Sequence, residues 1–448
     1  MGANSNLELL AQGICRDAKA IEAYRTQQGL PHLSFDSSSE PPTVHQEAPQ
    51  AVHEARQAII DNASQIQRLV LDPADIIPAL TINYQQLICI QWLCRFHVVS
   101  CVPLMGSVSY AEAASLCSVP EDQLRSVARM AIATNFLREI EGKDELAHNS
   151  MSAAFVRNPG LADWALFVTQ FSMPVAGSFA DATKKWGSTK RKDETAMNLA
   201  LKTDLPLFDF IKQSPEITRQ FAAYMRNVQQ SDGMSVRHLV NSYDWAALGE
   251  ATVIDIGGST GAVSVHLANM FPQLRFIVRD LHAVTNGSSG LMESQPEHIR
   301  TRIEFQAQDF FEPQPAERAN VFLMRMILHD WPKDEAVKIL RNIVPALKAS
   351  GRGVRLLIQD TVLPIPGSVS STQEALLRVR DLTMIQSFNS KERELAEFVK
   401  LLNLASSQDA RLVLKGVHTP AGSLMSVLEV AYEQTPNGDV LYSGTALA

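Results

Sequence analysis

The carboxy-terminal half of the chain alternates between short apolar runs typical of β-strands and longer stretches with helical spacing. The strand-like runs are ATVIDI, LRFIVRD, RIEFQAQD, ANVFLMRMIL, GVRLLIQD, RLVLKGV and LMSVLEVAYE. This alternation predicts an α/β fold, a mostly parallel Rossmann-like sheet of seven strands with helices on both faces. Only a short connection with Pro420 and Gly422 separates the last two runs. It predicts an antiparallel hairpin at the sheet edge.

The first of these strands runs into the glycine-rich turn DIGGSTG. A dinucleotide-binding turn needs the spacing G-x-G-x-x-G. Here Gly257 and Gly258 are adjacent and Gly261 follows, so that spacing is absent. Glycines still allow a ligand to approach the backbone closely. The carboxylate of Asp255 suits a ligand with an ammonium and a sulfonium better than a pyrophosphate. The turn favours S-adenosylmethionine, and a tight turn without a ligand is the alternative.

The next two strands also end in acidic residues. Asp280 closes FIVRD, where a carboxylate can accept hydrogen bonds from both hydroxyls of a ribose. Asp309 closes EFQAQD and can reach an adenine edge, with Phe310 beside it to pack on the ring. Open α/β sheets bind ligands at the carboxyl ends of their strands. Each acid alone is as readily an ordinary strand-end carboxylate, but the three strand ends together indicate a cofactor site.

The catalytic candidate follows the fourth strand. His329 and Asp330 come directly after VFLMRMIL and before a helix, on the same predicted edge. A neutral imidazole near pH 7 can deprotonate a hydroxyl group, as a methyl transfer to oxygen requires. Asp360 and Glu392 are the carboxylates available to orient it. Alternatively Asp360 caps a turn, and Asn389 with Glu392 has the spacing of a helix capping box.

The amino-terminal part is mainly helical. An amphipathic helix is expected within residues 1–30, followed by a Pro-rich loop at about 34–50 and further helices at about 52–102. The segment at 107–152 then follows the order of a winged helix: short helix, turn, longer helix and hairpin. Between residues 85 and 150, five basic residues stand against seven acidic ones. Because DNA recognition needs a positive field, a packing or dimerisation module is favoured over a nucleic-acid binder.

Helices are also expected across residues 161–245, with aromatic and methionine side chains at helical spacing. Most of these side chains belong to a core, and a few are candidates to line a pocket, among them Met173 and Met225. The expected domains are a helical dimerisation domain at 1–160, a helical connector with the substrate pocket at 161–245, and a cofactor-binding catalytic domain at 246–448.

The bulk properties restrict location and partners. The net charge of −8 argues against nucleic-acid binding, and polar residues interrupt the most apolar stretch, LICIQWLCRFHVVSCVPLM, so no membrane association is expected. No amino-terminal leader is recognisable. The five cysteines lack C-x-x-C spacing, which favours reduced thiols in a cytoplasmic protein, and no metal site is expected.

The motifs together resemble those of the plant- and fungal-type small-molecule O-methyltransferases. The matching stretches are AEAASLCSVPEDQLRSVARM, DIGGSTG, FIVRDL, QDFFE, LHDWPKDEAVKILRNIVPAL, DLTMIQSFNSKERE and LEVAYE. They read closer to fungal members than to plant ones. The resemblance implies a class I methyltransferase domain behind a helical, winged-helix-containing dimerisation domain. It also implies an intertwined homodimer whose amino-terminal region helps to close the partner's pocket.

The resemblance assigns roles residue by residue. For the cofactor they are Gly257, Gly258, Gly261, Asp280, Asp309 and Phe310, and we add Asp255 and Arg325 as further cofactor candidates. His329 is implied as general base, with Asp360 and Glu392 flanking it, and Met384 as a contact for the acceptor ring. Met173, Met225 and Asp330 are our further candidates for acceptor contact. The chain departs from the plant pattern at Ser259 (often Gly), His282 (usually Pro), Arg325 (Lys) and Asp360 (Glu), and none of these changes removes a reacting group.

The expected activity is S-adenosylmethionine-dependent methylation of a phenolic or enolic hydroxyl on a secondary metabolite, a polyketide or an alkaloid. A second interpretation is an enzyme with the same fold and bound cofactor that catalyses dehydration or a pericyclic reaction without methyl transfer. A third is a regulatory winged-helix protein with a vestigial ligand domain. The acidic winged-helix region and the complete catalytic set argue against it.

Overall fold

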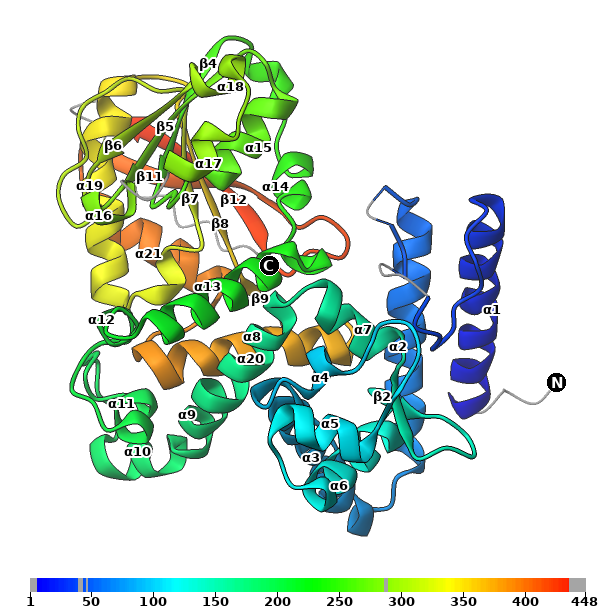
Figure 1. Ribbon diagram of the computed structural model, residues 1–448. Helices are drawn as coiled ribbons and strands as arrows, with labels where there is room; N and C mark the ends of the chain where they lie inside the picture. The colour runs from blue at the N-terminus through cyan, green and yellow to red at the C-terminus, as the bar shows by residue number, and fades with distance from the viewer. Residues whose placement is uncertain (1–5, 39–42, 46, 286–288, 435–448) are drawn as a thin grey trace. The chain divides into compact units, whose positions relative to one another are not determined.

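The computed structural model describes residues 6–38, 43–45, 47–285 and 289–434, and it divides into two compact units. Unit 1 comprises Met1–Ser188, Lys192–Ser231 and Ser370–Thr372, and unit 2 comprises Thr189–Arg191, Asp232–Val369 and Gln373–Ala448. Figure 1 labels the helices and strands, and its colour runs from blue to red along the chain. The three-domain division expected from the sequence stays a prediction.

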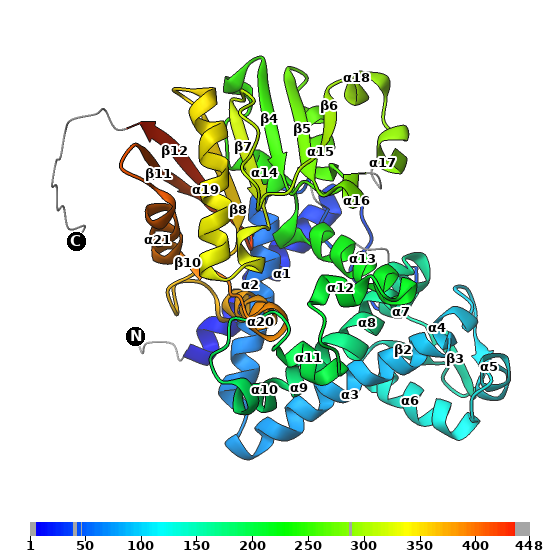
Figure 2. The same ribbon diagram turned by 90° about the vertical axis from the view of Figure 1, so that its left-hand side faces the viewer.

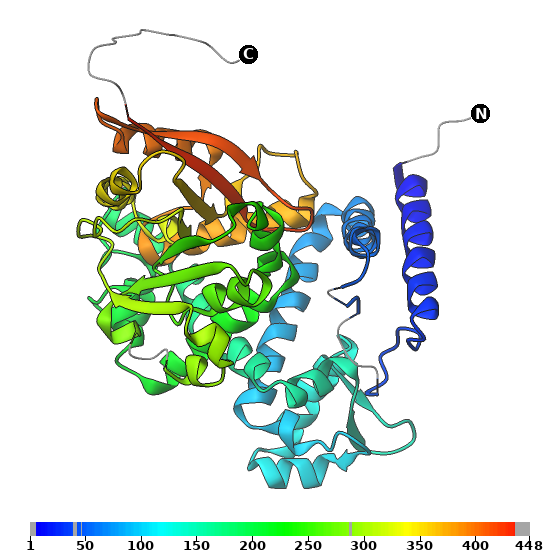
Figure 3. The same ribbon diagram turned by 90° about the horizontal axis from the view of Figure 1, so that it is seen from above.

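Unit 1 is mostly helical, as expected. Its helices within the described ranges are α1 (Asn6–Gln27), α2 (Gln50–Val70), α3 (Ile76–Arg95), α4 (Val98–Cys101), α5 (Tyr110–Cys117), α6 (Glu121–Ala133), α7 (Ser150–Arg157), α8 (Gly160–Phe167), α9 (Met173–Gly177), α10 (Phe179–Trp186), α11 (Ala196–Leu201), α12 (Leu207–Ile211) and α13 (Pro215–Gln230). Shorter helical turns are η1 (Pro73–Asp75) and η2 (Val168–Ser172). Helices α1 and α2 pack side by side, and Figure 1 shows both along their length, while Figure 3 shows α1 from above.

The loop expected at about 34–50 is described only in part, because residues 39–42 and 46 lie outside the described ranges. The apolar stretch that includes α3 is interrupted at His97, which takes a positive φ of 59° and separates α3 from α4. No helix within the described ranges is both long and apolar enough to cross a membrane.

A short helix, a turn, a longer helix and a hairpin follow one another from α5 to residue 148, in the order expected from the sequence. Helix α5 ends at Ser118, which takes a φ of 54°, and α6 begins after Pro120. The strands β1 (Val108–Ser109), β2 (Leu137–Glu139) and β3 (Glu145–His148) then form an antiparallel sheet in the order β1-β3-β2. Whether this module serves dimerisation stays a prediction.

Unit 2 contains the seven-stranded sheet, which confirms the expected fold class. Its strands are β4 (Ala251–Ile256), β5 (Leu274–Asp280), β6 (Ile303–Ala307), β7 (Val321–Arg325), β8 (Arg355–Asp360), β11 (Ala410–His418) and β12 (Ser426–Gln434). They lie in the order β11-β12-β8-β7-β4-β5-β6. Strands β8, β7, β4, β5 and β6 run parallel, and β12 is antiparallel to both β8 and β11. The hairpin at the sheet edge is therefore confirmed.

Helices cover both faces of this sheet, α19 and α21 on one face and α15 on the other. The helices that follow α13 in the described ranges are α14 (Arg237–Asn241), α15 (Ala262–Met270), α16 (His282–Thr285), α17 (Ser289–Glu293), α18 (Glu297–Arg300), α19 (Lys333–Ser350), α20 (Ser371–Phe388) and α21 (Leu395–Ala405), with the turns η3 (Asp232–Met234), η4 (Ala246–Leu248) and η6 (Leu328–Asp330). Figure 2 shows α19 in front of the strands. A short parallel ladder pairs β9 (Val362–Leu363) with β10 (Arg393–Glu394).

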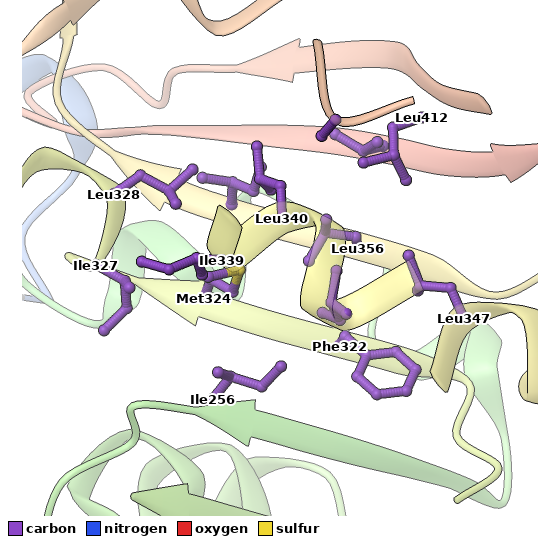
Figure 4. Packing of buried hydrophobic residues seen from close by; sticks show 14 of the residues in the cluster. Ile256, Phe322, Met324, Ile327, Leu328, Ile339, Leu340, Leu347, Leu356 and Leu412 are labelled. Carbon is purple, nitrogen blue, oxygen red and sulfur yellow. The ribbon is translucent and has the colours of Figure 1, made fainter. Parts of the chain in front are cut away.

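The strands read as continuous apolar runs because both of their faces are buried. Along β7, Phe322 and Met324 pack into the cluster that includes α19 and α21, while Val321 and Leu323 pack into the cluster that includes α15 and Trp245. Figure 4 shows the first of these clusters. This two-sided core holds the carboxyl edge of the sheet in place.

One strand is shorter than the sequence suggests. The apolar run 319–328 predicts a strand up to Leu328, but β7 ends at Arg325. Met326 takes a φ of 56°, which turns the chain out of the sheet. Ile327 and Leu328 stay apolar because they join the buried cluster rather than the ladder. This turn delivers His329 to the edge.

Candidate active site

The glycine turn after β4 fits its neighbours so closely that side chains are excluded. Gly257 has a φ of 69°, and its amide donates to the carbonyl of Arg279 at 2.7 Å. A Cβ atom on Gly258 would lie 2.8 Å from Oδ2 of Asp255, and one on Gly261 (φ 79°) would lie 2.8 Å from Cζ of Phe305. The turn therefore requires glycine for local reasons, and it exposes backbone at the carboxyl edge.

Asp255 supports the turn from inside. Its side chain is buried, and Oδ2 accepts a hydrogen bond from Oγ of Ser264 at 2.8 Å. Burial raises its pKa to about 6, although the hydrogen bond from Ser264 opposes that rise. The structure thus places the carboxylate beneath the turn, against α15.

The two other strand-end acids also bind backbone amides. Asp280 accepts hydrogen bonds from the amides of Ser259 at 2.8 Å and Leu281 at 2.7 Å, while burial raises its pKa. Asp309 lies two residues beyond β6 and accepts from the amide of Phe311 at 2.8 Å. The ring of Phe310 is partly buried, with its centroid 5.7 Å from that of Trp331.

His329 forms a buried pair with Glu392. The ring is 4% exposed, and its Nδ1 lies 3.0 Å from Oε1 of Glu392, which is 1% exposed. A carboxylate at this distance accepts the Nδ1 proton, so Nε2 is the nitrogen left for chemistry. That nitrogen lies 3.5 Å from Oδ1 of Asp330. The capping box suggested for Asn389 and Glu392 is not formed; the box at α21 uses Glu394 and Glu397.

Asp360 lies near this pair without bonding to the ring. Its Oδ2 accepts from the amide of Leu328 at 3.2 Å, so it fixes the backbone just before His329. Burial raises the pKa of Asp360 to about 7 against the opposing charge of His329. Burial alone would lower the pKa of His329, but Asp330, Glu392 and Asp360 outweigh it and raise that pKa to about 9. The charges around the ring therefore favour its protonated form in the ligand-free protein, so the neutral imidazole that a base requires has to form by loss of this proton.

Three residues that sequence reasoning passed over complete this arrangement. Ser390 donates from Oγ to the carbonyl of His329 at 2.6 Å. Arg393 donates to the carbonyls of Leu328 and Trp331, both at 2.5 Å. Arg380 lies 3.5 Å from Oε1 of Glu392. The ER pair in SKERE was visible in the sequence, but nothing local identified Ser390 or Arg380.

The remaining candidates are spread over both units. Arg325 donates to Oε1 of Gln359 at 2.9 Å and to the carbonyl of Met234 at 3.0 Å, and burial lowers its pKa to about 10. Met384 is partly buried on α20. Met173 and Met225 are partly buried on α9 and α13 of unit 1. The structure thus brings the cofactor, base and Met384 candidates together in unit 2.

Comparison with known proteins gives consistent results. Residues 190–407 match the family described as "O-methyltransferase domain", and residues 5–71 match "Trypacidin cluster transcriptional coactivator tpcD N-terminal domain". The chain is 47% identical to the O-methyltransferase VdtC of Byssochlamys spectabilis over 432 residues, covering 95% of this chain and 97% of VdtC.

Two solved structures share the fold. The crystal structure of OxaC in complex with SAH and oxaline matches with a TM-score of 0.68 and 21% identity, over 94% of this chain and 99% of OxaC. A structure titled "A Pericyclic Reaction enzyme" matches with a TM-score of 0.70 and 19% identity, over 95% of this chain and all of that one.

Proposed function

The chain belongs to the O-methyltransferase family and uses S-adenosylmethionine as its cofactor, and from this premise we propose that it methylates a phenolic or enolic hydroxyl of a secondary metabolite, with His329 as the general base. The observation that carries the proposal is the buried contact of 3.0 Å between Nδ1 of His329 and Oε1 of Glu392. A polyketide or an alkaloid is the proposed acceptor class.

The residues at the carboxyl edge fit this cofactor. The turn at Gly257, Gly258 and Gly261 has no room for side chains, as a close backbone approach requires. Among the residues that the structure describes, the buried oxygens Oδ1 of Asp360 and Oε2 of Glu392 have no hydrogen-bond partner, so the edge has carboxyl oxygens to offer a cationic ligand. When bound, the cofactor supplies an electrophilic methyl group carried on a sulfonium.

We assign Asp280 to the ribose, Asp309 and Phe310 to the adenine, and Asp255 and Arg325 to supporting positions around the cofactor. Asp280 and Asp309 each accept backbone amides, which fixes their carboxylates at successive strand ends. Open α/β sheets bind their ligands at this edge. This arrangement supports the assignment made from the family resemblance.

The chain's own residues supply the proton chemistry. Glu392 holds the Nδ1 proton of His329, so that the lone pair of Nε2 can accept the proton of the acceptor hydroxyl. Because the pKa of the free ring is raised to about 9, the base must first lose its proton, and kcat/KM is expected to rise with pH up to about that value. Asp360, Ser390 and Arg393 keep the backbone on either side of His329 in place.

For the acceptor we propose contacts with Asp330 and Met384, and we keep Met173 and Met225 as further candidates. Methionine suits an aromatic acceptor because its thioether packs favourably on ring edges. The position of Asp330, 3.5 Å from Nε2 of His329, supports its role.

We also propose that the protein is a homodimer in the cytoplasm. Apolar side chains are exposed on two helices, Ile77, Leu80 and Tyr84 on α3 and Leu376, Val379 and Leu382 on α20. Exposed apolar rows of this kind are typical of subunit interfaces. The five cysteines are free thiols, which suits a reducing compartment. Light scattering of Leu80→Glu beside the wild type tests the dimer.

The experiment that tests the function is turnover of methyl-labelled S-adenosylmethionine with a panel of phenolic and polyketide metabolites. The wild type is expected to transfer label to an organic-soluble product. His329→Gln should lose on the order of 10²- to 10⁴-fold in rate, the usual contribution of a general base, while cofactor affinity by calorimetry stays unchanged. A metabolite that changes in mass or ring structure without label would instead indicate a dehydratase or pericyclase.

A further inference from the structure

Arg380 contacts the carboxylate that holds the proposed base. Its side chain leaves α20 and is 17% exposed. Nε donates to Oγ1 of Thr361 at 2.9 Å, and Nη1 lies 3.4 Å from the sulfur of Met234. Its Nη2 lies 3.5 Å from Oε1 of Glu392. The guanidinium is thus fixed by three different elements and faces a completely buried carboxylate.

The oxygen that Arg380 faces is the one that His329 uses. Oε1 of Glu392 lies 3.0 Å from Nδ1 of His329, so two cationic groups share one oxygen. Within the described part of the chain the other oxygen, Oε2, has no hydrogen-bond partner. A guanidinium stays charged at all working pH values. Its attraction therefore favours the orientation of the carboxylate in which one oxygen faces both the guanidinium and the imidazole.

Among the charged groups around His329 and Glu392, Arg380 differs from Arg393 in its hydrogen-bond partners. His329 faces the carboxylates of Asp330, Asp360 and Glu392. Glu392 in turn faces Arg380 and Arg393, and its backbone amide donates to Oδ1 of Asp381 at 3.1 Å. Arg393, however, has both terminal nitrogens bound to the carbonyls of Leu328 and Trp331.

The charge of Arg380 also acts on the proton of His329. Although burial disfavours the ionised form of Glu392, the neighbouring His329 and Arg380 lower its pKa, so the carboxylate stays charged. A carboxylate shared with a permanent cation stabilises an imidazolium less than an unshared one does. Arg380 therefore opposes the three carboxylates that hold the proton on the ring.

We propose that Arg380 is a positioning residue for the reaction, which orients Glu392 toward Nδ1 of His329 and makes the ring release its proton more readily. This inference rests on the proposed role of His329 as the base. It adds to that role a residue on a different element, because Arg380 lies on α20 whereas His329 lies on η6.

The test compares Arg380→Gln, Arg380→Lys and the matched control Arg378→Gln. Arg378 lies two residues earlier on α20 and pairs with Glu374, away from Glu392. The first readout is the NMR titration of the His329 imidazole in ligand-free protein, identified with His329→Gln. In Arg380→Gln the midpoint should rise by about half to one pH unit, because a positive charge that disfavours the imidazolium is removed. Arg380→Lys and Arg378→Gln should titrate like the wild type.

The second readout is the pH profile of kcat/KM. In Arg380→Gln its acidic limb should move up by the same amount, so the value at pH 7 falls about 3- to 10-fold and recovers above pH 9.5. A loss that is equal at all pH values would overturn the proposal, because it would mean a purely structural role. So would an unshifted titration in folded Arg380→Gln.

The two proposals can fail separately. If His329→Gln keeps full activity, the assignment of the base is wrong, whatever the NMR titrations show. If His329→Gln is inactive but neither the titration nor the profile responds to Arg380→Gln, the base stands and the positioning role of Arg380 is wrong.

Discussion

The carboxyl edge of the sheet has two halves that are built differently. In the turn half, at the ends of β4, β5 and β6, Asp255, Asp280 and Asp309 are held by partners between one and 21 residues away, three of them backbone amides. In the base half, at the ends of β7 and β8, His329 and Asp360 meet partners 63 and 32 residues away. One half depends on local chain geometry and the other on tertiary assembly.

This difference separates two roles. Backbone amides hold a carboxylate at a fixed position with little dependence on neighbouring side chains, which suits the binding of a common cofactor. Buried side-chain pairs change the proton affinity of their members, which suits acid–base chemistry. The base half accordingly contains the two highest of these pKa values, about 9 for His329 and about 7 for Asp360, against about 6 for Asp255 in the turn half.

The largest effect that would separate the halves is expected from Glu392→Gln. The amide cannot stabilise a protonated ring, so turnover should fall on the order of 10³- to 10⁴-fold, as when the orienting acid of a histidine base is removed. Cofactor affinity should stay within about twofold, because the turn half is untouched. Glu397→Gln, which alters the capping box of α21 and the ion pair with Lys391 but leaves Glu392 in place, is the control. Wild-type turnover in Glu392→Gln would contradict the division.

The second test compares one buried acid from each half. A carboxyl with a raised folded-state pKa binds its proton more tightly in the folded state, so its stabilising contribution is present at low pH and lost as pH rises to that pKa. The pKa of Asp360 rises from 3.8 in the unfolded chain to about 7 in the folded protein, and that of Asp255 rises from 3.8 to about 6. Removing Asp360 should therefore abolish roughly 4 kcal/mol of pH-dependent stability loss, and removing Asp255 roughly 3 kcal/mol.

Urea unfolding of Asp360→Asn and Asp255→Asn between pH 4 and pH 8, beside the wild type, measures these slopes. His329 also makes the free energy of unfolding of the wild type fall as pH rises from 6.5 to about 9. Its raised pKa means that the folded state binds this proton more tightly than the unfolded state does. Wild-type stability that increases across this range would refute the raised pKa values of Asp360 and Asp255.

A third test changes the backbone of the turn half by replacing one glycine and measures cofactor binding. In Gly257→Ala the new Cβ meets the side chain of Ile327 and must keep a φ of 69°, so the turn should shift. The cofactor dissociation constant should rise roughly 10- to 30-fold, the equivalent of about 1.5–2 kcal/mol of backbone strain. Gly353→Ala is the control, because Gly353 also has a positive φ but an open surrounding. Equal calorimetric affinities in both variants would mean that the turn does not bind the cofactor.

The smallest effect is expected from Ser390→Ala. The hydroxyl bonds the carbonyl of His329 at 2.6 Å, and its loss leaves that buried acceptor unpaired. The free energy of unfolding should fall by about 1–2 kcal/mol, and kcat by only a few fold, since Glu392 still orients the ring. Thermal unfolding and initial rates measure both, with Ser387→Ala as a buried-serine control on the same segment. A loss of kcat as large as that of Glu392→Gln would mean that Ser390 has a role of its own in the chemistry.

The same division explains what sequence reasoning achieved. Strands β4 and β5 were predicted to the residue, because both faces are buried and a glycine turn or an acid marks their ends. The pairing of His329 with Glu392 was one of two alternatives and could not be decided from spacing. Arg380 and Ser390 were missed because their partners lie 12 and 61 residues away, on other elements. The end of β7 was misplaced because apolar residues beyond Arg325 serve the core rather than the ladder.

The two-residue ladder between β9 and β10 has a consequence for how such an enzyme diversifies. The ladder pairs Val362 with Arg393. Glu392 comes directly before Arg393, and Asp360 comes two residues before Val362, so the ladder holds the two carboxylates near the same end of the paired strands. All of α20 lies between its two strands as an inserted segment. Substitutions along that insertion leave the ladder intact, provided that Arg380 and Asp381 are retained, since Oδ1 of Asp381 accepts from the amide of Glu392. The positions of α20 around Met384 are therefore the ones to randomise in a directed-evolution library aimed at new acceptors.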